Sequence, residues 1–173
     1  MKKWGWGIAG FIWIAGITLV MGSLSALHNV SFFPDTTLRS SVSPQEKWTL
    51  THVLGQGCKC SKIVYEYLLQ RGPRSDVFES VVVLGDMPEE STRLSQKGFH
   101  VEKKEARSLA SEKAVGVPFL LITSGKGEAL YAGGYASSMI KENTPLLDLQ
   151  ILDSLRGGKS AQELPIFGCA ISQ

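Results

Sequence analysis

The chain has 173 residues, of which 43% are hydrophobic and 20% charged, so it can form one globular domain with a short extension. This composition excludes a disordered or collagen-like chain. The formal net charge is +2, and Lys2 and Lys3 at the start of the chain account for that excess. The remainder is neutral overall, which excludes nucleic-acid binding through neutralisation of phosphates, so we expect no nucleic-acid partner.

The first segment is strongly apolar. Residues 4–21 read WGWGIAGFIWIAGITLVM, with Thr18 as the only polar side chain, and no charged residue follows until Asp35. At about 1.5 Å per residue, a helix over residues 4–27 is long enough to cross a hydrocarbon core of about 30 Å. The pattern therefore predicts one N-terminal transmembrane helix.

The charges that flank this segment predict its orientation. Lys2 and Lys3 precede it, and positive charge stays on the cytoplasmic side of a membrane. We expect residues 1–28 to form a single-pass anchor in the cytoplasmic (inner) membrane, with the N-terminus inside and the domain facing the periplasm or another extracytoplasmic space. The membrane would then be a partner through this helix. A cleaved signal peptide is the alternative, because small residues follow the apolar run: Ser23, Ser25 and Ala26.

The chain after the apolar segment divides into three parts. Residues 29–47 mix Ser, Thr and Pro and are typical of a tether, although an edge strand or short helix fits their last ten residues equally well. Residues 48–158 form the predicted folded domain, and residues 159–173 form a C-terminal tail that carries Cys169.

The predicted domain begins with a βαβ unit. Residues 48–54 are rich in β-branched and apolar side chains, which indicates a strand. Apolar residues in 60–70 recur at a spacing of three and four, which indicates a helix. Residues 77–85 contain a continuous apolar run, typical of a strand buried on both faces. The further predicted elements are a helix (88–97), a short strand (99–103), a helix (105–114), a β-hairpin (119–123 with 128–135) and a final helix (144–156).

The chain has three cysteines, Cys58, Cys60 and Cys169, which are too few for a disulfide framework. Cys58 and Cys60 flank Lys59 at the junction between the first strand and its helix. The positive end of the helix dipole and the charge of Lys59 both favour a thiolate there. Cys60 lies on the apolar stripe of the helix and Cys58 lies outside it. We therefore expect Cys58 to be the accessible nucleophile and Cys60 the shielded resolving thiol.

The order of elements, with a cysteine pair opening the first helix, resembles the thioredoxin superfamily over residues 48–157. The segment GVPFLL, residues 116–121, resembles the loop in which that family carries a cis-proline facing the cysteines. The resemblance implies an α/β, thioredoxin-like fold, a central mixed sheet flanked by helices, with Pro118 in the site. Together with an anchor, the chain is most similar to the tethered thiol-disulfide proteins of bacterial envelopes, such as the groups called RedB, TlpA and ResA.

Two features depart from the family pattern. Thioredoxins have Trp before the first cysteine and two residues within the pair, whereas here Gly57 precedes Cys58 and Lys59 alone intervenes. The family also places a buried carboxylate six residues before the first cysteine, where this chain has His52. A histidine there can accept the proton of Cys60 during exchange, or it can simply be satisfied by a backbone hydrogen bond.

Three functions follow from these residues. The first is a thiol-disulfide oxidoreductase without a cofactor, with protein or small-molecule thiols and disulfides as partners. The second is a carrier that binds Cu(I) through the thiolates of Cys58, Cys60 and Cys169. The third is a redox-silent thioredoxin-like interaction module. Cys169 would be a second resolving thiol or a third metal ligand if the tail folds back over the site, and otherwise a tail cysteine.

Overall fold

The computed structural model describes residues 12–21, 36, 40, 46–105 and 115–171. The chain separates into two compact units, residues 1–30 and residues 31–173. Most of the predicted tether, and all but the first residue of the helix expected over 105–114, lie outside the described residues.

The described part of the first unit is a helix over residues 12–21 with mostly exposed side chains. Among the described residues, no helix has both the length and the apolar character needed to cross a membrane. The expectation of one N-terminal transmembrane helix is therefore wrong. At about 1.5 Å per residue, residues 12–21 span about 15 Å, half of a hydrocarbon core of about 30 Å. The apolar run in the sequence is longer than the described helix that forms within it.

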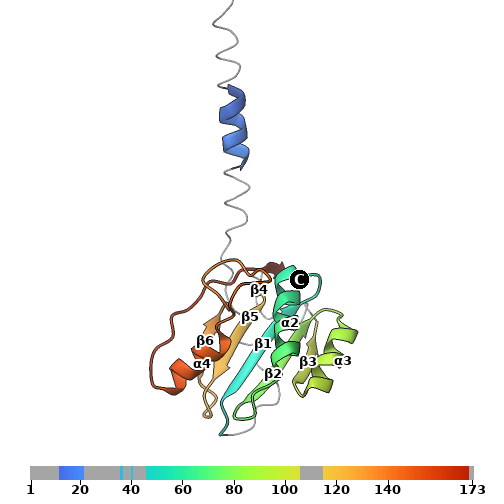
Figure 1. The fold of residues 1–173 in the computed structure, drawn as a ribbon, viewed down its shortest axis with the longest axis vertical. Helices are drawn as coiled ribbons and strands as arrows, with labels where there is room; N and C mark the ends of the chain where they lie inside the picture. Colours follow the sequence, from blue (N-terminus) through green and yellow to red (C-terminus); the bar gives the residue numbers. More distant parts are fainter. Residues whose placement is uncertain (1–11, 22–35, 37–39, 41–45, 106–114, 172–173) are drawn as a thin grey trace, which may run out of the picture. The chain divides into compact units, whose positions relative to one another are not determined.

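The second unit alternates strands and helices in its first half and ends in strands around one further helix (Figure 1). The predicted βαβ unit, the helix and strand that follow it, and the hairpin are all confirmed. The elements are β1 (Thr49–Gly55), α2 (Lys59–Arg71), β2 (Phe78–Leu84), α3 (Pro88–Lys97), β3 (His100–Lys104), β4 (Val115–Val117), β5 (Phe119–Thr123), β6 (Ala129–Gly133), α4 (Asp148–Arg156) and β7 (Cys169–Ile171).

The central sheet is mixed, with the strand order β3-β2-β1-β5-β6. β1 pairs with β2 in parallel, and β2 pairs with β3 in parallel. β5 runs antiparallel to β1 and also to β6. β1 is therefore the middle strand, and its C-terminal end delivers the chain to the start of α2 (Figure 1).

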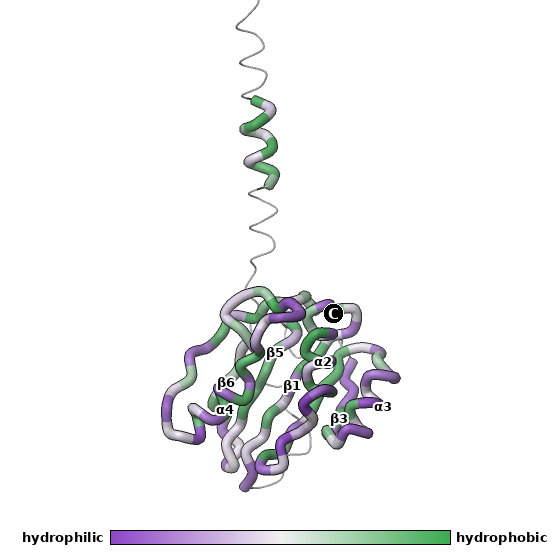
Figure 2. The backbone as a smooth tube through the Cα atoms, in the orientation of Figure 1, coloured by the Kyte–Doolittle hydropathy of each residue, from purple (hydrophilic) through white to green (hydrophobic). Residues whose placement is uncertain are grey.

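Side chains of the central strands alternate between two apolar clusters. Leu50 and Leu54 of β1 face a cluster that includes buried residues of α2, α3 and α4. Val53, between them, faces a smaller cluster with residues of β4 and the C-terminal segment. This period of two is what a strand covered on both faces requires. Figure 2 shows the hydrophobic colouring concentrated on the inner strands and the hydrophilic colouring on α3.

Helix α4 begins later than the predicted residue 144. The amide of Leu147 donates a hydrogen bond to the carbonyl of Tyr135 at 2.9 Å, which ties this stretch to the loop after β6. Asp148 then becomes the first helical residue. The apolar spacing of residues 146–155 predicted the helix. Such a spacing cannot predict a tertiary hydrogen bond, so it did not locate the first residue of the helix.

The C-terminal segment folds back onto the domain and forms β7. The amide of Gly134 donates to the carbonyl of Leu164 at 2.9 Å. A Cβ atom on Gly134 would lie 2.0 Å from the carbonyl oxygen of Pro165, so this crossing requires glycine. β7 then pairs antiparallel with β4, with Cys169 opposite Val117. Sequence patterns missed both strands because each has three residues.

Candidate functional site

Cys58 occupies the junction between the middle strand and the helix that covers it. It is the N-cap residue of α2, with extended backbone angles (φ −88°, ψ 118°). N-cap side chains commonly accept hydrogen bonds from the first turn, but the Cys58 side chain makes no such capping bond. The Cys58 thiol instead has a hydrogen-bond acceptor outside the helix.

The Cys58 thiol contacts a backbone group at the end of β4. The protonated Cys58 thiol donates a hydrogen bond to the carbonyl of Val117, with Sγ and the oxygen 3.4 Å apart. The peptide bond between Val117 and Pro118 is cis. The cis isomer expected from the resemblance is thus confirmed, and its carbonyl side faces the first cysteine.

Two further thiols approach Cys58. Cys60 lies two residues along the same helical turn, and its thiol donates to the carbonyl of Ile140 at 3.9 Å. Cys169 comes from β7, opposite Val117 in the strand pairing. Both Cys60 and Cys169 lie close enough to Cys58 to lower the pKa of its thiol. The structure thus brings together four of the predicted site residues, Cys58, Cys60, Pro118 and Cys169.

The three thiols have very different proton affinities. Hydrogen bonding by Cys60 lowers the pKa of Cys58 to about 5, with further lowering by Cys169 and Ser61, and burial opposes the change. The same hydrogen bond with Cys58, together with burial, raises the pKa of Cys60. Burial, followed by the hydrogen bond with Cys58, raises the pKa of Cys169 to about 11. These pKa shifts make Cys58 the first of the three thiols to ionise.

Exposure of the cysteines differs from the prediction. Cys58 is only 4% exposed, whereas Cys60 and Cys169 are half-buried. The expectation that Cys58 is the accessible cysteine is wrong because the C-terminal segment, which has no element in the sequence-based fold, packs over it. Cys58 shares its apolar cluster with Val117 and Ile166, and Cys169 packs against that cluster.

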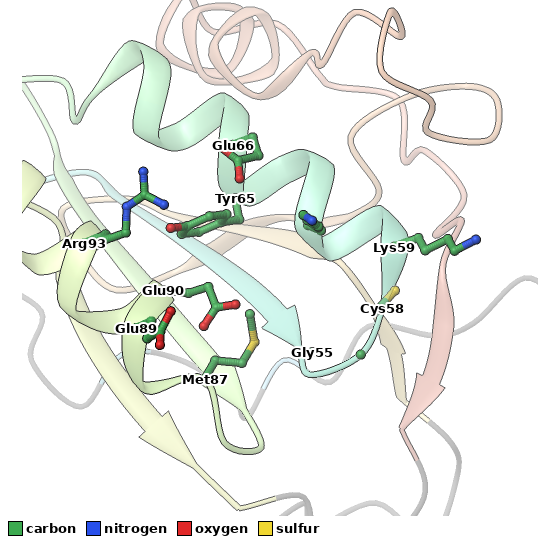
Figure 3. Close-up of a pocket in the computed structure, with 11 residues that line it drawn as sticks. Gly55, Cys58, Lys59, Tyr65, Glu66, Met87, Glu89, Glu90 and Arg93 are labelled. Atoms are coloured by element: carbon green, nitrogen blue, oxygen red, sulfur yellow. The ribbon is translucent and has the colours of Figure 1, made fainter.

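Lys59 is exposed, and its side chain extends away from α2 (Figure 3). The groups that lower the pKa of Cys58 are Cys60, Cys169 and Ser61. Lys59 acts through its backbone instead, because its amide hydrogen-bonds to Cys169 and lowers the pKa of that thiol. The proposed electrostatic role of the lysine side chain stays a prediction.

His52 lies in a buried polar network. Its Nδ1 is 2.9 Å from the hydroxyl of Tyr135, and its Nε2 is 3.2 Å from Oε2 of Glu79. Glu79 also accepts two hydrogen bonds from Arg71, at 3.0 and 2.8 Å. Burial opposes ionisation of Glu79, but the hydrogen bonds from His52 and Arg71 outweigh it and lower the pKa to about 2. Neither nitrogen of His52 bonds to a cysteine, so its role as proton acceptor for Cys60 stays a prediction.

A cavity of about 390 Å³ lies beside Cys58, between α2 and the start of α3 (Figure 3). Tyr65 is 3% exposed, and its hydroxyl, which lacks a hydrogen-bond partner among the described residues, points toward Arg93. Burial raises the pKa of Tyr65, and the charge of Arg93 opposes that rise. The lining residues are Gly55, Gly57, Cys58, Lys59, Lys62, Tyr65, Glu66, Met87, Glu89, Glu90 and Arg93.

Within residues 12–21, 46–105 and 115–171, no group of three or more His, Cys, Asp or Glu side chains is placed to hold a metal ion. The copper-carrier alternative through Cys58, Cys60 and Cys169 gains no support from this part of the chain.

Sequence reasoning missed two contributors to the thiol site. Ser61 lowers the pKa of Cys58 through both its amide and its hydroxyl. Gly168 lies against the carbonyl of Val117, since a Cβ atom at Gly168 would be only 1.8 Å from that oxygen. The sequence did contain a signal for Ser61, because a serine three residues after the N-cap residue is placed to donate to its side chain. Gly168 had no such signal, because nothing in the sequence predicts the pairing of β7 with β4.

Comparison with known proteins yields fold neighbours only. No protein-family model and no curated protein matches the chain. An uncharacterized conserved protein from Geobacillus kaustophilus is similar in structure, with a TM-score of 0.54 at 18% identity over 84% of this chain and 90% of that one. A hypothetical protein from Sinorhizobium meliloti 1021 gives a TM-score of 0.51 at 17% identity over 73% and 80% of the two chains. These likenesses show the fold alone.

Proposed function

We propose that this protein is a thiol-disulfide oxidoreductase in which Cys58 is the nucleophile and Cys60 is a resolving thiol. The observation that carries the proposal is the placement of Cys58 at the start of α2, against the cis Val117–Pro118 peptide and beside Cys60. The pKa of Cys58 is lowered to about 5 by Cys60, Cys169 and Ser61, so the sulfur is a thiolate at neutral pH. The thiolate is the attacking form of cysteine in disulfide exchange.

The reaction takes two exchange steps. The Cys58 thiolate attacks one sulfur of a substrate disulfide, forms a mixed disulfide and releases the other half as a thiolate. Cys60 then loses its proton to the released thiolate or to water and attacks the Cys58 sulfur, which forms the Cys58–Cys60 disulfide and releases the second half. The substrate gains two electrons and the cysteine pair loses two. An external dithiol restores the pair, and the reverse direction oxidises a substrate dithiol.

The high pKa of Cys60 suits this order of events. The Cys60 thiol donates to the carbonyl of Ile140 in the structure, and a protonated Cys60 that turns to the Cys58 thiolate stabilises it and lowers its pKa. Once Cys58 is in a mixed disulfide, its negative charge is gone, and both the hydrogen bond and the charge that raise the pKa of Cys60 disappear with it. Deprotonation of Cys60 is therefore easier after the first step than before it.

The resemblance to the thioredoxin superfamily adds support. The cysteine pair opens the helix after the middle strand, and the cis Val117–Pro118 bond lies against the first cysteine. A stable disulfide in such a site is typical of compartments outside the cytoplasm, and the extracytoplasmic location stays a prediction.

The cavity beside Cys58 indicates which class of substrate can reach the thiol. Cys58 is 4% exposed, and the cavity of about 390 Å³ lies at the lower end of the range of small-molecule sites. Among thiol and disulfide partners, we propose that small molecules reach Cys58 in this conformation, and that protein substrates need the C-terminal segment to move.

An exchange assay tests the function. The purified protein is mixed with glutathione disulfide, and both released glutathione and the protein's mass are followed. We expect stoichiometric release, followed by turnover when dithiothreitol is supplied. Cys58→Ser should lower the rate by at least about 100-fold, because it removes the nucleophile. Ser75→Ala, at an exposed position between α2 and β2, is the matched control. Absence of exchange in the wild-type protein would favour the redox-silent interaction module.

A further inference from the structure

The C-terminal strand carries Cys169 to the same backbone group that binds Cys58. In the pairing of β7 with β4, Cys169 lies opposite Val117. The carbonyl of Val117 is also the acceptor for the thiol of Cys58, at 3.4 Å. Two cysteines that are distant in the sequence therefore flank one peptide group. In Figure 1 the dark red C-terminal segment lies beside the start of α2.

Close packing fixes this arrangement. A Cβ atom at Gly168 would lie 1.8 Å from the carbonyl oxygen of Val117, so the strand can approach only with glycine at this position. A Cβ atom at Gly55 would lie 2.5 Å from Cγ2 of Val117 and 3.0 Å from Cδ1 of Ile171. The atom that opposes a side chain at Gly168 belongs to the backbone and cannot move aside, whereas those at Gly55 belong to side chains of β4 and β7; both glycines let these strands approach the end of β1.

Cys60 and Cys169 approach Cys58 from different parts of the fold. Cys60 belongs to the first turn of α2, and its thiol donates to the carbonyl of Ile140. Cys169 belongs to β7, opposite Val117, and Cys58 and Cys169 each shift the pKa of the other's thiol. Cys58 thus has two thiol neighbours, one from α2 and one from β7.

We propose that Cys169 is a second resolving thiol, so that Cys58 closes a disulfide with either Cys60 or Cys169. This inference rests on the proposed function, because it assumes that Cys58 forms a mixed disulfide with substrate. It assigns a catalytic role to a strand outside the βαβ unit and hairpin.

The step balances in the same way as resolution by Cys60. The thiol of Cys169 loses its proton to water or to the leaving thiolate, and its sulfur attacks Cys58 Sγ. The bond between Cys58 and the substrate sulfur breaks, the Cys58–Cys169 bond forms, and the substrate half leaves as a thiolate. No further oxidant enters. A dithiol returns both cysteines to the reduced form.

Removal of Cys60 tests the proposal directly. Reduced Cys60→Ser protein is mixed with one equivalent of glutathione disulfide, quenched in acid and digested for peptide mapping by mass spectrometry. We expect release of both glutathione halves and a Cys58–Cys169 disulfide. The Cys60→Ser, Cys169→Ser double variant should instead retain one glutathione on Cys58.

The outcomes separate this inference from the proposed function. If Cys60→Ser alone retains glutathione on Cys58, Cys169 does not resolve and the inference is overturned, while the proposed function stands. If neither the wild-type protein nor any variant forms a disulfide at Cys58, the proposed function itself fails.

A substitution of Gly168 tests the placement of Cys169 while both Cys58 and Cys169 are kept. Gly168→Val in the Cys60→Ser background keeps Cys58 and Cys169 but displaces β7 from Val117. We expect resolution to slow by about 10- to 100-fold, the range that a small misplacement of reacting groups produces. Gly168→Ala is the milder variant if valine prevents folding.

The matched control is Gly157→Ala in the same background, since a Cβ there would lie 3.4 Å from its nearest neighbours. This control variant should resolve the mixed disulfide at Cys58 as fast as the Cys60→Ser protein does. Equal rates in the Gly168 and Gly157 variants, with both folded by circular dichroism, would show that the position of β7 does not matter and would overturn the inference.

Discussion

Ser61 connects Cys58 to the end of the middle strand. The hydroxyl oxygen of Ser61 accepts a hydrogen bond from the amide of Gly55 at 3.0 Å. That leaves the hydroxyl proton free for the Cys58 thiolate, and both this hydroxyl and the Ser61 amide lower the pKa of Cys58. The strand end therefore orients the donor that stabilises the thiolate.

Ser61→Ala should raise the pKa of Cys58 by about one unit, because a hydrogen bond to a charged group contributes about 1.5 kcal/mol. The absorbance of the thiolate near 240 nm, titrated in the wild-type protein and the variant, measures the change. Ser75→Ala should leave the titration unchanged. An unchanged midpoint in Ser61→Ala would mean that Cys60 and Cys169 alone stabilise the thiolate.

The redox potential should be more positive than the value of about −270 mV for thioredoxin. Stabilisation of the Cys58 thiolate favours the reduced form of the protein, and the pKa of Cys58 is lowered to about 5. Equilibration with glutathione buffers, followed by mass spectrometry, gives the potential. A potential at or below that of thioredoxin would mean that the disulfide form is stabilised at least as much as the thiolate form.

Glu79→Gln should destabilise the fold by about 3 kcal/mol, toward the lower end of the cost of breaking a buried ion pair. Glu79 accepts hydrogen bonds from both His52 and Arg71, while Asp148, at 2.9 Å from Arg71, still balances part of the charge in the variant. Urea unfolding at pH 7 measures the loss. Glu128→Gln, at an exposed position, is the control and should unfold like the wild-type protein.

The same pair predicts how stability depends on pH. The pKa of Glu79 is lowered to about 2 from 4.5, so its contribution is fully present above pH 4.5 and is lost as the pH falls towards 2. The difference in unfolding free energy between the wild-type protein and Glu79→Gln should therefore shrink over that range. If the difference in unfolding free energy stayed constant with pH, the charge of Glu79 would not contribute to the stability of the fold.

Arg93→Gln should slow the reaction of Cys58 with an anionic disulfide and leave the reaction with neutral hydroxyethyl disulfide unchanged. Arg93 lines the cavity beside Cys58, as do Lys62 and Glu90, so its removal makes that cavity more negative (Figure 3). We expect a loss of about three- to tenfold, the size of a partly exposed charge interaction of about 1 kcal/mol. Equal slowing of both probes would indicate a structural effect of the substitution.

The sequence predicted the elements whose apolar pattern is long enough to read. β1 and β2 are runs rich in apolar and β-branched residues, α2 has apolar residues at a spacing of three and four, and Cys58 and Cys60 lie where the first strand gives way to that helix. The resemblance also placed Pro118 correctly, as a cis-proline beside Cys58.

The sequence could not predict the C-terminal part of the site. β7 and its partner β4 have three residues each, so neither has a measurable period. Their pairing depends on Gly168, which permits contact with the carbonyl of Val117. Burial of Cys58 follows from that contact. A thiol that looked accessible from the pattern of α2 is therefore covered by residues more than a hundred positions away.

The central claim is that Cys58 is a stabilised thiolate, and the pH dependence of its alkylation tests it most directly. The protein is treated briefly with iodoacetamide between pH 3.5 and 10, and the labelled peptides are quantified by mass spectrometry. We predict that Cys58 is labelled before Cys60 and Cys169, with a rate that rises through a midpoint near pH 5, the pKa to which its neighbours lower it. A midpoint above pH 8, or faster labelling of Cys60 or Cys169 at neutral pH, would contradict the assignment of Cys58 as the nucleophile.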